Sequence, residues 1–451
     1  MEDPTNLMTV IGVMTFREAL DLGAMRRMLE DRLLVHDRFR QHVVETPGRF
    51  GKPHWRDVDD FRLDDHLHEI RLPPPADERA LQDFVGDVMS TPLDYAKPLW
   101  HFYYVPNYGS GSALVARLHH CLGDGVALMR VMLGLADTAE TEAASPQGGI
   151  PHRTGLTGLA RAAGSAVGTL GKLVGVGLFR DPRTALKGDL GARKCATWSR
   201  AIALDEVKEI GRALGGTVND VLCTAVTGAL RTYLQKYQTV KPGLTLRAVV
   251  PVNMRPPHEA PGLGNKFGLV FLSLPVGARR SVDRLRHLKR RMDGIKRSGE
   301  AAVVYGLLRL LGTTAAIVEM GVVNLLGRNS TAVMTNVPGP REPLYLCGCR
   351  IEDLIFWVPR SGRLALGVSM LSYAGAVRLG IAADRQVIAD PEVIVEGFHA
   401  ALEELGADAL RADPTLRPPS PEGRGGQGVS TVVRPTSRST PSETRSAPAR
   451  R

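Results

Sequence analysis

RLHHCLGDGVALM, residues 117–129, places two adjacent histidines four and five residues ahead of an aspartate that is followed by glycine. The residues before them, SALVARL at 112–118, have the pattern of a strand, whose side chains point alternately to its two faces. Leu114, Ala116 and Leu118 therefore share a face with His120, whereas Val115 and Arg117 share the other with His119. The two rings point apart, which disfavours one metal site built from both. His120, just past the end of an apolar face, is the better candidate for a working side chain.

Two interpretations of this stretch remain open from the residues alone. Asp124 stands where VALMRVMLGLAD begins a helix, so it is a suitable N-cap, and Gly125 can take turn geometry that is closed to other residues. The stretch is then either a strand end and a helix cap without chemistry, or the seat of a single catalytic histidine. The sequence carries no G-x-S-x-G elbow, no phosphate-binding G-x-x-x-x-G-K-[ST] loop and no H-E-x-x-H zinc helix.

The composition is that of an intracellular globular protein. With 451 residues, 43% hydrophobic and 23% charged, the chain is too long for one ordinary core, and two domains are expected. Five scattered cysteines do not form a secreted disulfide framework, and the acidic start MEDPTN is not a signal peptide. We therefore expect a cytoplasmic protein. Cys347 and Cys349 are separated by one residue and no second pair follows nearby, so no metal site is expected.

The chain divides into four parts. Residues 1–137 mix helix and strand patterns and predict an α/β (α+β) domain, while 138–200 shift to Gly, Ala, Ser and Thr and predict an exposed linker. Residues 201–410 again mix elements and form the second predicted domain. The tail, 411–451, is rich in Arg, Pro and Ser and is expected to be disordered.

Three segments raise the question of a lipid surface. The apolar runs 162–179 and 302–327 are interrupted by charge or glycine, and we interpret them as packed or interfacial helices rather than membrane spans. The predicted helix 284–297 is strongly basic and is expected either to be a solvated face or to attract anionic lipid or CoA phosphates. The net charge is +10, but the basic residues lack interleaved aromatics, so no nucleic-acid partner is expected.

HHCLGDG matches the H-H-x-x-x-D-G signature of the CoA-dependent acyltransferase superfamily. The chain resembles the bacterial wax ester synthase/diacylglycerol acyltransferase family in particular, over roughly residues 1–405. The companion stretches, in family order, are PLDYAKPLW, TVNDVLCTAVTGALRTYL, PVNMRP followed by LGNKFG, TNVPGP and SMLSYAGAVRLGIAADRQVI. One short motif is only moderately specific, but six stretches in order make a strong resemblance.

The resemblance implies two chloramphenicol-acetyltransferase-like domains around a central substrate tunnel, with 138–200 as the crossover linker between them. It makes His120 the general base within the catalytic group His119, His120 and Asp124, with Asp124 holding the loop. Gly125, Asn219 and Asp220 support the motif; Asn219 either donates to the oxyanion or shapes the tunnel, and a plain helix cap is equally open. Pro98 to Trp100 and Asn336 to Pro340 are assigned backbone shaping and no chemistry. No cofactor is implied, because acyl-CoA is a substrate.

The expected function is direct transfer of a long acyl chain from acyl-CoA to diacylglycerol or a fatty alcohol, without an acyl-enzyme. The rival hypothesis is a catalytically impaired relative that binds lipid or lipid droplets. It is motivated by the basic helix and by an opening at Met1 to Thr5 where relatives carry a preceding segment. Acyl transfer on carrier-bound substrates is a third reading. The expected partners are acyl-CoA, a lipid acceptor and a membrane or lipid-droplet surface. The sequence does not decide acceptor, chain length or oligomeric state.

Overall fold

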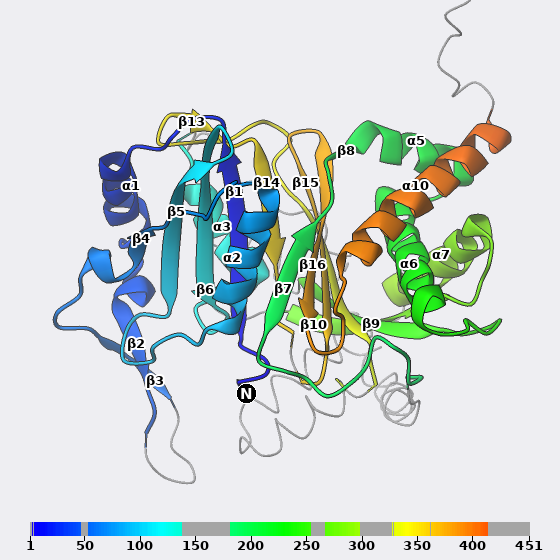
Figure 1. The fold of residues 1–451 in the computed structure, drawn as a ribbon, viewed down its shortest axis with the longest axis horizontal. Coiled ribbons are helices and arrows are strands. Elements are labelled where there is room, and N and C mark those ends of the chain that lie inside the picture. Colours follow the sequence, from blue (N-terminus) through cyan, green and yellow to red (C-terminus); the bar gives the residue numbers. More distant parts are fainter. Residues whose placement is uncertain are drawn as a thin grey trace, which may run out of the picture.

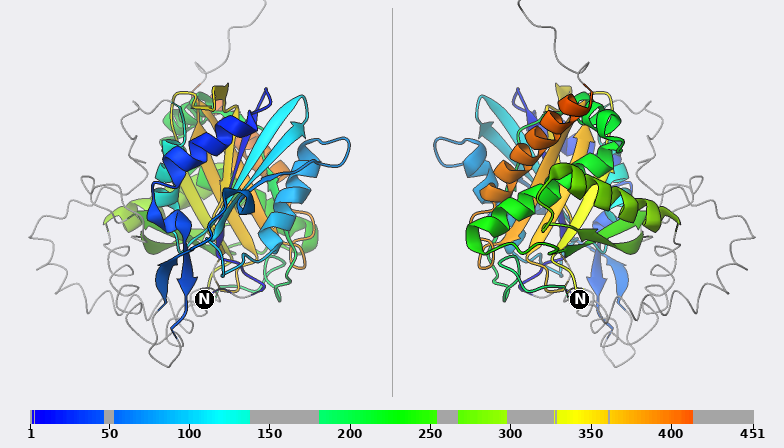
Figure 2. Two further views of the ribbon diagram at one scale, coloured as in Figure 1. Left: turned by 90° about the vertical axis from the view of Figure 1, so that its left-hand side faces the viewer. Right: turned by 90° about the vertical axis from the view of Figure 1, so that its right-hand side faces the viewer.

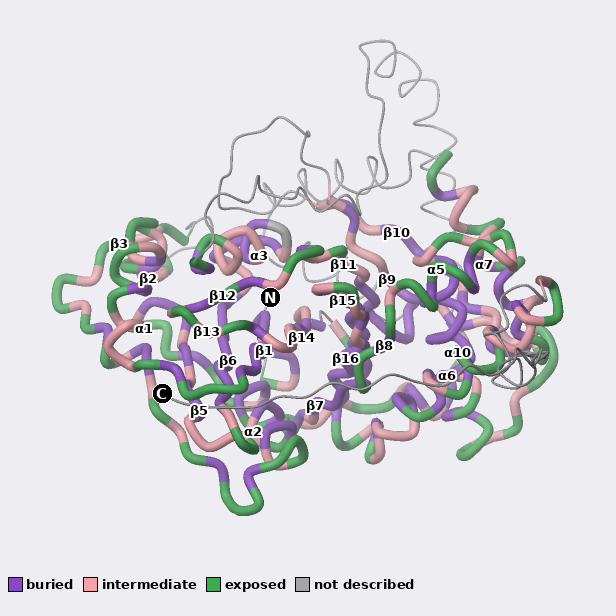
Figure 3. The backbone as a smooth tube through the Cα atoms, turned by 90° about the horizontal axis from the view of Figure 1, so that it is seen from above, coloured by how far each residue is buried: buried purple, intermediate pink, exposed green. Residues whose placement is uncertain are grey.

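A computed structural model describes residues 2, 4–46, 53–137, 181–253, 267–297, 327, 329–360 and 362–413. These residues form two α/β halves that lie side by side, each built on its own sheet (Figure 1). Residues of the two large sheets are largely buried, and exposed residues lie mainly at the periphery (Figure 3). The apolar run 162–179, nearly all of 302–327, and the tail beyond Asp413 lie outside the described residues.

Among the described residues, five strands form the first sheet, in the order β14-β1-β6-β5-β4. Their bounds are β1 Thr9–Phe16, β4 Leu67–Glu69, β5 Trp100–Tyr108, β6 Gly111–His119 and β14 Asp353–Trp357. Strand β6 lies between β1 and β5 and is antiparallel to both. The strand that leads to the two histidines is therefore central and rigidly held.

Helices cover both faces of the first sheet. They are α1 Leu22–Met28, continued by a π-helical turn Leu29–Leu33, α2 Glu78–Ser90 and α3 Gly125–Gly134. Helices α1 and α3 share a buried cluster with Leu114, Ala116 and Leu118 of β6. Helix α2 packs on the opposite face with Val115. The alternation predicted for β6 is confirmed, and its apolar character on both faces follows from the two helical layers.

The second sheet has the order β10-β9-β11-β15-β16-β7, with β8 paired to β16. Its strands are β7 Lys194–Trp198, β8 Ile202–Ala203, β9 Leu246–Asn253, β10 Phe267–Leu274, β11 Ala332–Pro338, β15 Leu366–Tyr373 and β16 Ala376–Asp384. Its helices are α5 Leu204–Leu214, α6 Val218–Tyr237, α7 Ser281–Arg297 and α10 Glu392–Ala412. Helices α6 and α10 lie side by side across the sheet (Figure 2, right). These helices bury the core of the second half on the side away from the first sheet (Figure 1).

Short elements complete the described chain. Two small hairpins pair β2 Gln41–Val44 with β3 His54–Asp57, and β12 Tyr345–Leu346 with β13 Cys349–Arg350. Two 3-10 turns span Asp37–Arg40 and Leu63–Asp65. Cys347 and Cys349 flank the tip of the second hairpin. Within the described ranges, no group of three or more His, Cys, Asp or Glu side chains is arranged to hold a metal ion.

Two strands depart from the expected division at residues 137 and 200. Strand β7 lies inside the predicted linker but pairs with β16 of the second sheet. Strand β14 follows β11 of the second sheet in the chain, yet it pairs with β1 of the first. Trp198 of β7 and Trp357 of β14 meet at the junction, with ring centroids 5.7 Å apart. The chain therefore crosses from the second half into the first sheet through β14, and the two halves share a buried contact.

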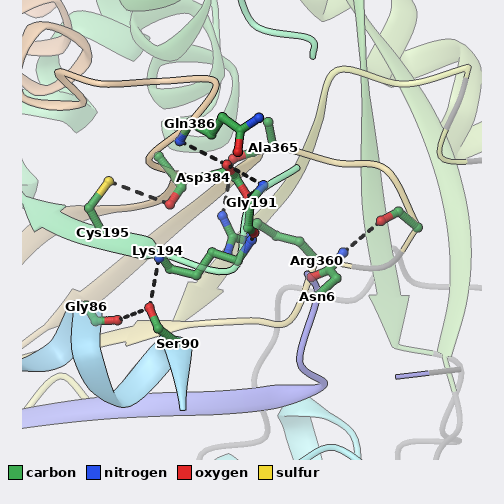
Figure 4. A network of polar contacts seen from close by, with 12 residues as sticks. Asn6, Gly86, Ser90, Gly191, Lys194, Cys195, Arg360, Ala365, Asp384 and Gln386 are labelled. Atoms are coloured by element: carbon green, nitrogen blue, oxygen red, sulfur yellow. Dashed lines mark hydrogen bonds and ion pairs between the residues drawn. The ribbon is translucent and has the colours of Figure 1, made fainter. Parts of the chain in front are cut away.

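A buried polar network fixes this junction (Figure 4). Lys194 of β7 is ion-paired with Asp384 of β16, and the two side chains are 2% and 0% exposed. The backbone N–H of Lys194 donates to Ser90 Oγ at the end of α2, at 2.8 Å. Helix α2 comes so close that a Cβ on Gly86 would lie 3.0 Å from the Lys194 carbonyl oxygen. The network thus ties a helix of the first half to the edge of the second sheet.

In the described part of the chain, no single helix is both long and apolar enough to cross a membrane. Helices α5 and α6 reach that length and composition only together, and they are bent by 95° relative to each other. Most of α6 is buried in the core of the second half, which accounts for its apolar composition.

Candidate active site

His120 lies immediately after β6, at the edge where the first half faces the second. Its backbone N–H donates to the Met8 carbonyl at 2.7 Å, which continues the pairing of β6 with the residues before β1. The chain then turns, and Leu122 N–H donates to the His119 carbonyl at 3.1 Å. A paired strand end and a tight turn therefore fix the backbone of His120 from both sides.

The ring of His119 is engaged on the opposite face from His120. Its Nδ1 accepts from the Cys121 N–H at 3.2 Å, and its Nε2 lies 3.3 Å from a carboxylate oxygen of Glu2. This pattern fits the tautomer with the proton on Nε2, donated to Glu2. Tyr95 also donates to Glu2 and lies 3.2 Å from the same ring nitrogen. His119 thus belongs to a three-residue network that holds the turn, whereas the ring of His120 contacts Phe267 of the second half.

Burial would raise the pKa of Glu2, but hydrogen bonds from His119 and Tyr95 outweigh it and lower that pKa to about 2. The carboxylate therefore stays charged at any pH near neutrality. A permanent acceptor beside the Nε2 proton keeps His119 in a single orientation.

His120 faces the second half of the molecule. Its ring meets that of Phe267, the first residue of β10, edge to face with centroids 5.8 Å apart. Burial lowers the pKa of His120 from its ordinary value near 6.5, and the charge of Asp124 opposes this shift in part. The imidazole is accordingly neutral at pH 7 and able to accept a proton.

Asp124 caps α3 as expected. It is 2% exposed, its Oδ1 accepts from the Ala127 N–H at 3.0 Å, and its carbonyl accepts from Leu128 N–H at 2.9 Å. The explanation offered for Gly125 is wrong: its φ is not in the left-handed region, and a Cβ there would meet no atom within 4 Å. Gly125 is simply the first residue of α3, where the backbone accepts any side chain.

Asn219 and Asp220 open α6 in the second half. Asp220 closes a capping box with Thr217, accepting from its backbone N–H at 2.9 Å while Thr217 Oγ1 accepts from the Asp220 N–H at 3.2 Å. The Oδ1 of Asn219 accepts from Nδ2 of Asn336 on β11, at 2.8 Å. Strand β11 is parallel to β9, whose end pairs with Phe267. The asparagine pair therefore lies toward the same end of the second sheet as the residue that contacts His120.

Sequence reasoning did not assign three of these partners. Phe267 stood inside LGNKFG, a stretch quoted for the resemblance, and Glu2 inside the opening MEDPTN. Nothing in the spacing of either stretch reveals which side chain reaches a histidine. Asn336 was given no role beyond backbone shape. Each contact joins residues more than 100 positions apart in the chain, and only the fold brings them together.

Several basic side chains of helix α7 are engaged in contacts within the protein, which its sequence does not indicate. Arg284 is buried and ion-paired with Glu404 of α10. Arg286 and Lys289 pair with acids of their own helix, Asp283 and Asp293, and Arg291 donates to the Phe271 carbonyl. Several of the cations offered to a lipid surface are therefore engaged within the protein.

Comparison with known families gives two matches that together span most of the chain. Residues 1–176 match the model described as the wax ester synthase/diacylglycerol acyltransferase catalytic domain, and residues 263–406 match the WS/DGAT C-terminal domain. Among curated relatives, a probable diacylglycerol O-acyltransferase of Mycobacterium tuberculosis is 29% identical over 427 residues, covering 88% of this chain and 91% of the relative. Another from the same organism, with the same description, is 28% identical over 414 residues, covering 84% and 90%.

Solved structures support the fold. The wax ester synthase/diacylglycerol acyltransferase from Marinobacter aquaeolei has a TM-score of 0.65 at 24% identity, covering 90% of this chain and 96% of that one. The first condensation domain of the calcium-dependent antibiotic synthetase has a TM-score of 0.58 at 16% identity, covering 91% and 93%. The expectation of a mixed α/β fold in two domains is confirmed.

Proposed function

The chain belongs to the wax ester synthase/diacylglycerol acyltransferase family, and we propose that it is an O-acyltransferase with His120 as its general base. Its substrates are a long-chain acyl-CoA and an acceptor alcohol, either diacylglycerol, giving triacylglycerol, or a fatty alcohol, giving a wax ester. The names of the relatives support the first acceptor and the family description supports both.

In the proposed reaction, His120 accepts the hydroxyl proton of the acceptor as its oxygen attacks the thioester carbonyl. The tetrahedral oxyanion collapses, the carbon–sulfur bond breaks, and the departing CoA thiolate takes the proton back from His120. The ester forms directly, with no acyl-enzyme and no cofactor. Proton transfer of this kind contributes about 10²–10⁴-fold, so positioning and oxyanion donors must supply the remaining acceleration.

The observation that carries the proposal is the position of His120, which faces the second half of the molecule. It is the motif side chain that points at the other half of the molecule, and burial against Phe267 keeps it unprotonated at neutral pH. His119 and Asp124 are positioning residues in this scheme: the first braces the turn through Glu2, and the second caps α3 while its charge acts on His120.

The asparagine pair has a supporting role in the proposal. Asn219 accepts from Asn336 through Oδ1, so this contact does not use its amide Nδ2, and an amide N–H is a suitable oxyanion donor. We assign Asn219 that role and Asn336 the role of orienting it. Asp220, which closes the capping box, positions the start of α6.

The acceptors are water-insoluble and reside in a membrane or lipid droplet, from which they must move to reach His120. We therefore propose that the enzyme acts in the cytoplasm at such a surface. This location rests on substrate chemistry. The ion pairs of α7 give no independent support to a purely lipid-binding role, which remains an outcome of the test below.

The test is release of free CoA thiol from palmitoyl-CoA with hexadecanol or dioleoylglycerol as acceptor. Wild type, His120→Ala and the control His287→Ala, an exposed histidine of α7, are compared side by side. Acceptor-dependent release should fall by about 10²–10⁴-fold in His120→Ala and stay unchanged in the control. Retention of full turnover by a folded His120→Ala variant would remove the base from the mechanism. No release by folded wild type with either acceptor would favour the lipid-binding alternative.

A further inference from the structure

A cavity of about 750 Å³ lies between α6, α10 and the turn that precedes α7. These elements cover the second sheet on the side away from the first half, where α6 and α10 lie side by side (Figure 2, right). Arg231, which lines the cavity, follows Asn219 by twelve residues on α6, about 18 Å along the helix. The cavity is therefore separate from the end of α6 that lies toward His120.

Three arginines line this cavity with a single carboxylate, that of Glu404. Glu404 is already used, because Arg284 donates to it at 2.6 Å and the backbone N–H of Ser281, at the start of α7, donates to it at 3.2 Å. Arg284 is itself 3% exposed and also donates to the carbonyls of Ala278 and Arg279. The charge of Arg284 is thus balanced, whereas those of Arg231 and Arg279 are in excess.

The two surplus guanidinium groups, those of Arg231 and Arg279, line the same cavity. Arg231 is fixed by donation to the Val276 carbonyl at 2.8 Å, an uncharged partner. Burial lowers the pKa of Arg231, and the charges of Arg284 and Arg279 lower it further. Like charges gathered in a recess raise the energy of the empty protein, and a bound anion would relieve it. The Nε of Arg284 is also buried and finds no hydrogen-bond acceptor among the described residues.

We propose that this cavity is a binding site for a small phosphate monoester. A phosphate monoester carries a charge of about −1.5 to −2 near pH 7, which matches the two surplus guanidinium charges. Planar guanidinium groups bind phosphate oxygens through paired hydrogen bonds. The proposal does not depend on the acyl-transfer mechanism.

The rest of the lining indicates a compact, polar ligand. Thr232, Gln235 and Gln238 add hydroxyl and amide groups, and none of the described lining residues is aromatic. A nucleobase would find no ring to stack on, and an acyl chain would find only Val240 and two alanines. The same phosphate chemistry is presented by a free sugar or glycerol phosphate and by the headgroup of phosphatidic acid, and the experiment separates these two sources.

The test measures binding to the purified full chain by isothermal titration calorimetry, with glycerol 3-phosphate and inorganic phosphate as probes. Arg279→Ala is the test variant, because Arg279 is exposed and its loss should not disturb the fold. Arg280→Ala is the matched control, since the neighbouring arginine is exposed as well but does not line the cavity. We expect saturable binding at one site, weakened at least about tenfold in Arg279→Ala and unchanged in Arg280→Ala.

A second arm uses flotation with vesicles of phosphatidylcholine, with and without phosphatidic acid. Arg279-dependent binding of the soluble probes identifies a free phosphate monoester as the ligand. Arg279-dependent binding that occurs only with phosphatidic acid vesicles identifies a lipid headgroup. Absence of binding in both arms, or equal weakening by Arg279→Ala and Arg280→Ala, would show that the cavity is not a phosphate site.

Discussion

At the scale of the residue, two neighbouring histidines at the end of β6 differ in their surroundings and therefore in their roles. His119 meets a carboxylate, a phenol and a backbone N–H, all of which fix its ring. His120 meets an aromatic ring from the other half of the molecule. Hydrogen bonds make His119 a positioning residue, whereas desolvation makes His120 a proton acceptor, although both side chains have the same intrinsic chemistry.

The pH dependence of activity should report the burial of His120. Because burial lowers its pKa below 6.5, the neutral base persists as the pH falls through 6.5, and kcat/KM should decline only at more acid pH. Phe267→Ala should admit water and move the acid limb back toward 6.5. The measurement is kcat/KM against pH for both proteins, and an acid limb in wild type at or above 6.5 would contradict the effect of burial.

Asp124 combines a cap and a charge, and two substitutions separate them. Asparagine caps helices as well as aspartate does, so Asp124→Asn should keep the stability but remove the charge that raises the pKa of His120. Its acid limb should then move to lower pH. Asp124→Ala loses the cap as well and should cost about 0.5–2 kcal/mol of unfolding free energy. Urea unfolding and the pH profile together check both parts; equal stability of the two variants would argue against the cap.

At the scale of the element, local patterns predicted most of what is local. The alternation before His119 predicted β6, the apolar spacing after Asp124 predicted α3, and both are confirmed with Asp124 as cap. The expectation for Gly125 failed because glycine alone does not reveal φ. A plain helix cap was one alternative offered for Asn219, but the N-cap of α6 is Thr217, and Asp220 completes its capping box. The partner of Asn219 was not foreseen, since Asn336 lies on a strand 117 residues later.

A cluster of three histidines, His66 just before β4, His68 on β4 and His101 on β5, should make the fold sensitive to acid. His66 stacks on Trp100 and His101, and His68 and His101 share a hydrogen bond of 2.9 Å between ring nitrogens. Burial, followed by the charges of His66 and His68, lowers the pKa of His101 to about 3. Burial also lowers the pKa values of His66 and His68. Protonation of this cluster is therefore opposed by folding.

The sign of the stability change follows from these shifts. Between about pH 6.5 and pH 3 the unfolded chain binds more protons at these histidines than the folded chain, so the free energy of unfolding falls as the pH is lowered through that window. His101→Phe should flatten the dependence, whereas His287→Ala, at an exposed site, should leave it unchanged. Urea unfolding at pH 7, 6 and 5 measures it, and a wild-type stability that does not change from pH 7 to 5 would rule out this cluster as an acid-sensitive element.

At the scale of the whole molecule, the sequence predicted two domains but not how they are joined. Their boundaries were placed where composition changes, yet β7 lies inside the predicted linker and β14 crosses into the first sheet. A strand of five residues carries no sign of which sheet it will enter. That choice is made by pairing with β1 and by the buried contact of Trp357 with Trp198, which are long-range terms that no local pattern contains.

The junction should be most sensitive to the loss of its buried anion Asp384. Asp384, 0% exposed, faces two cations: Lys194, to which it is ion-paired, and Arg360, whose pKa burial lowers to about 10 against the opposing charge of Asp384. Asp384→Asn keeps the shape but leaves two buried cations uncompensated, and removing one partner of a buried pair costs about 3–5 kcal/mol. Lys194→Met instead leaves one carboxylate facing one guanidinium, and should cost less.

Urea unfolding followed by tryptophan fluorescence measures this difference, because Trp198 and Trp357 lie at the same junction. Asp205→Asn, which breaks the exposed pair with Lys208, serves as the control and should leave the transition unchanged. If Lys194→Met is less stable than Asp384→Asn, the proposed balance of one buried anion against two buried cations is wrong. If the order is as expected, CoA release by Asp384→Asn should also be lost at lower urea than in wild type, because His120 and Phe267 come from different halves and meet only while the junction holds.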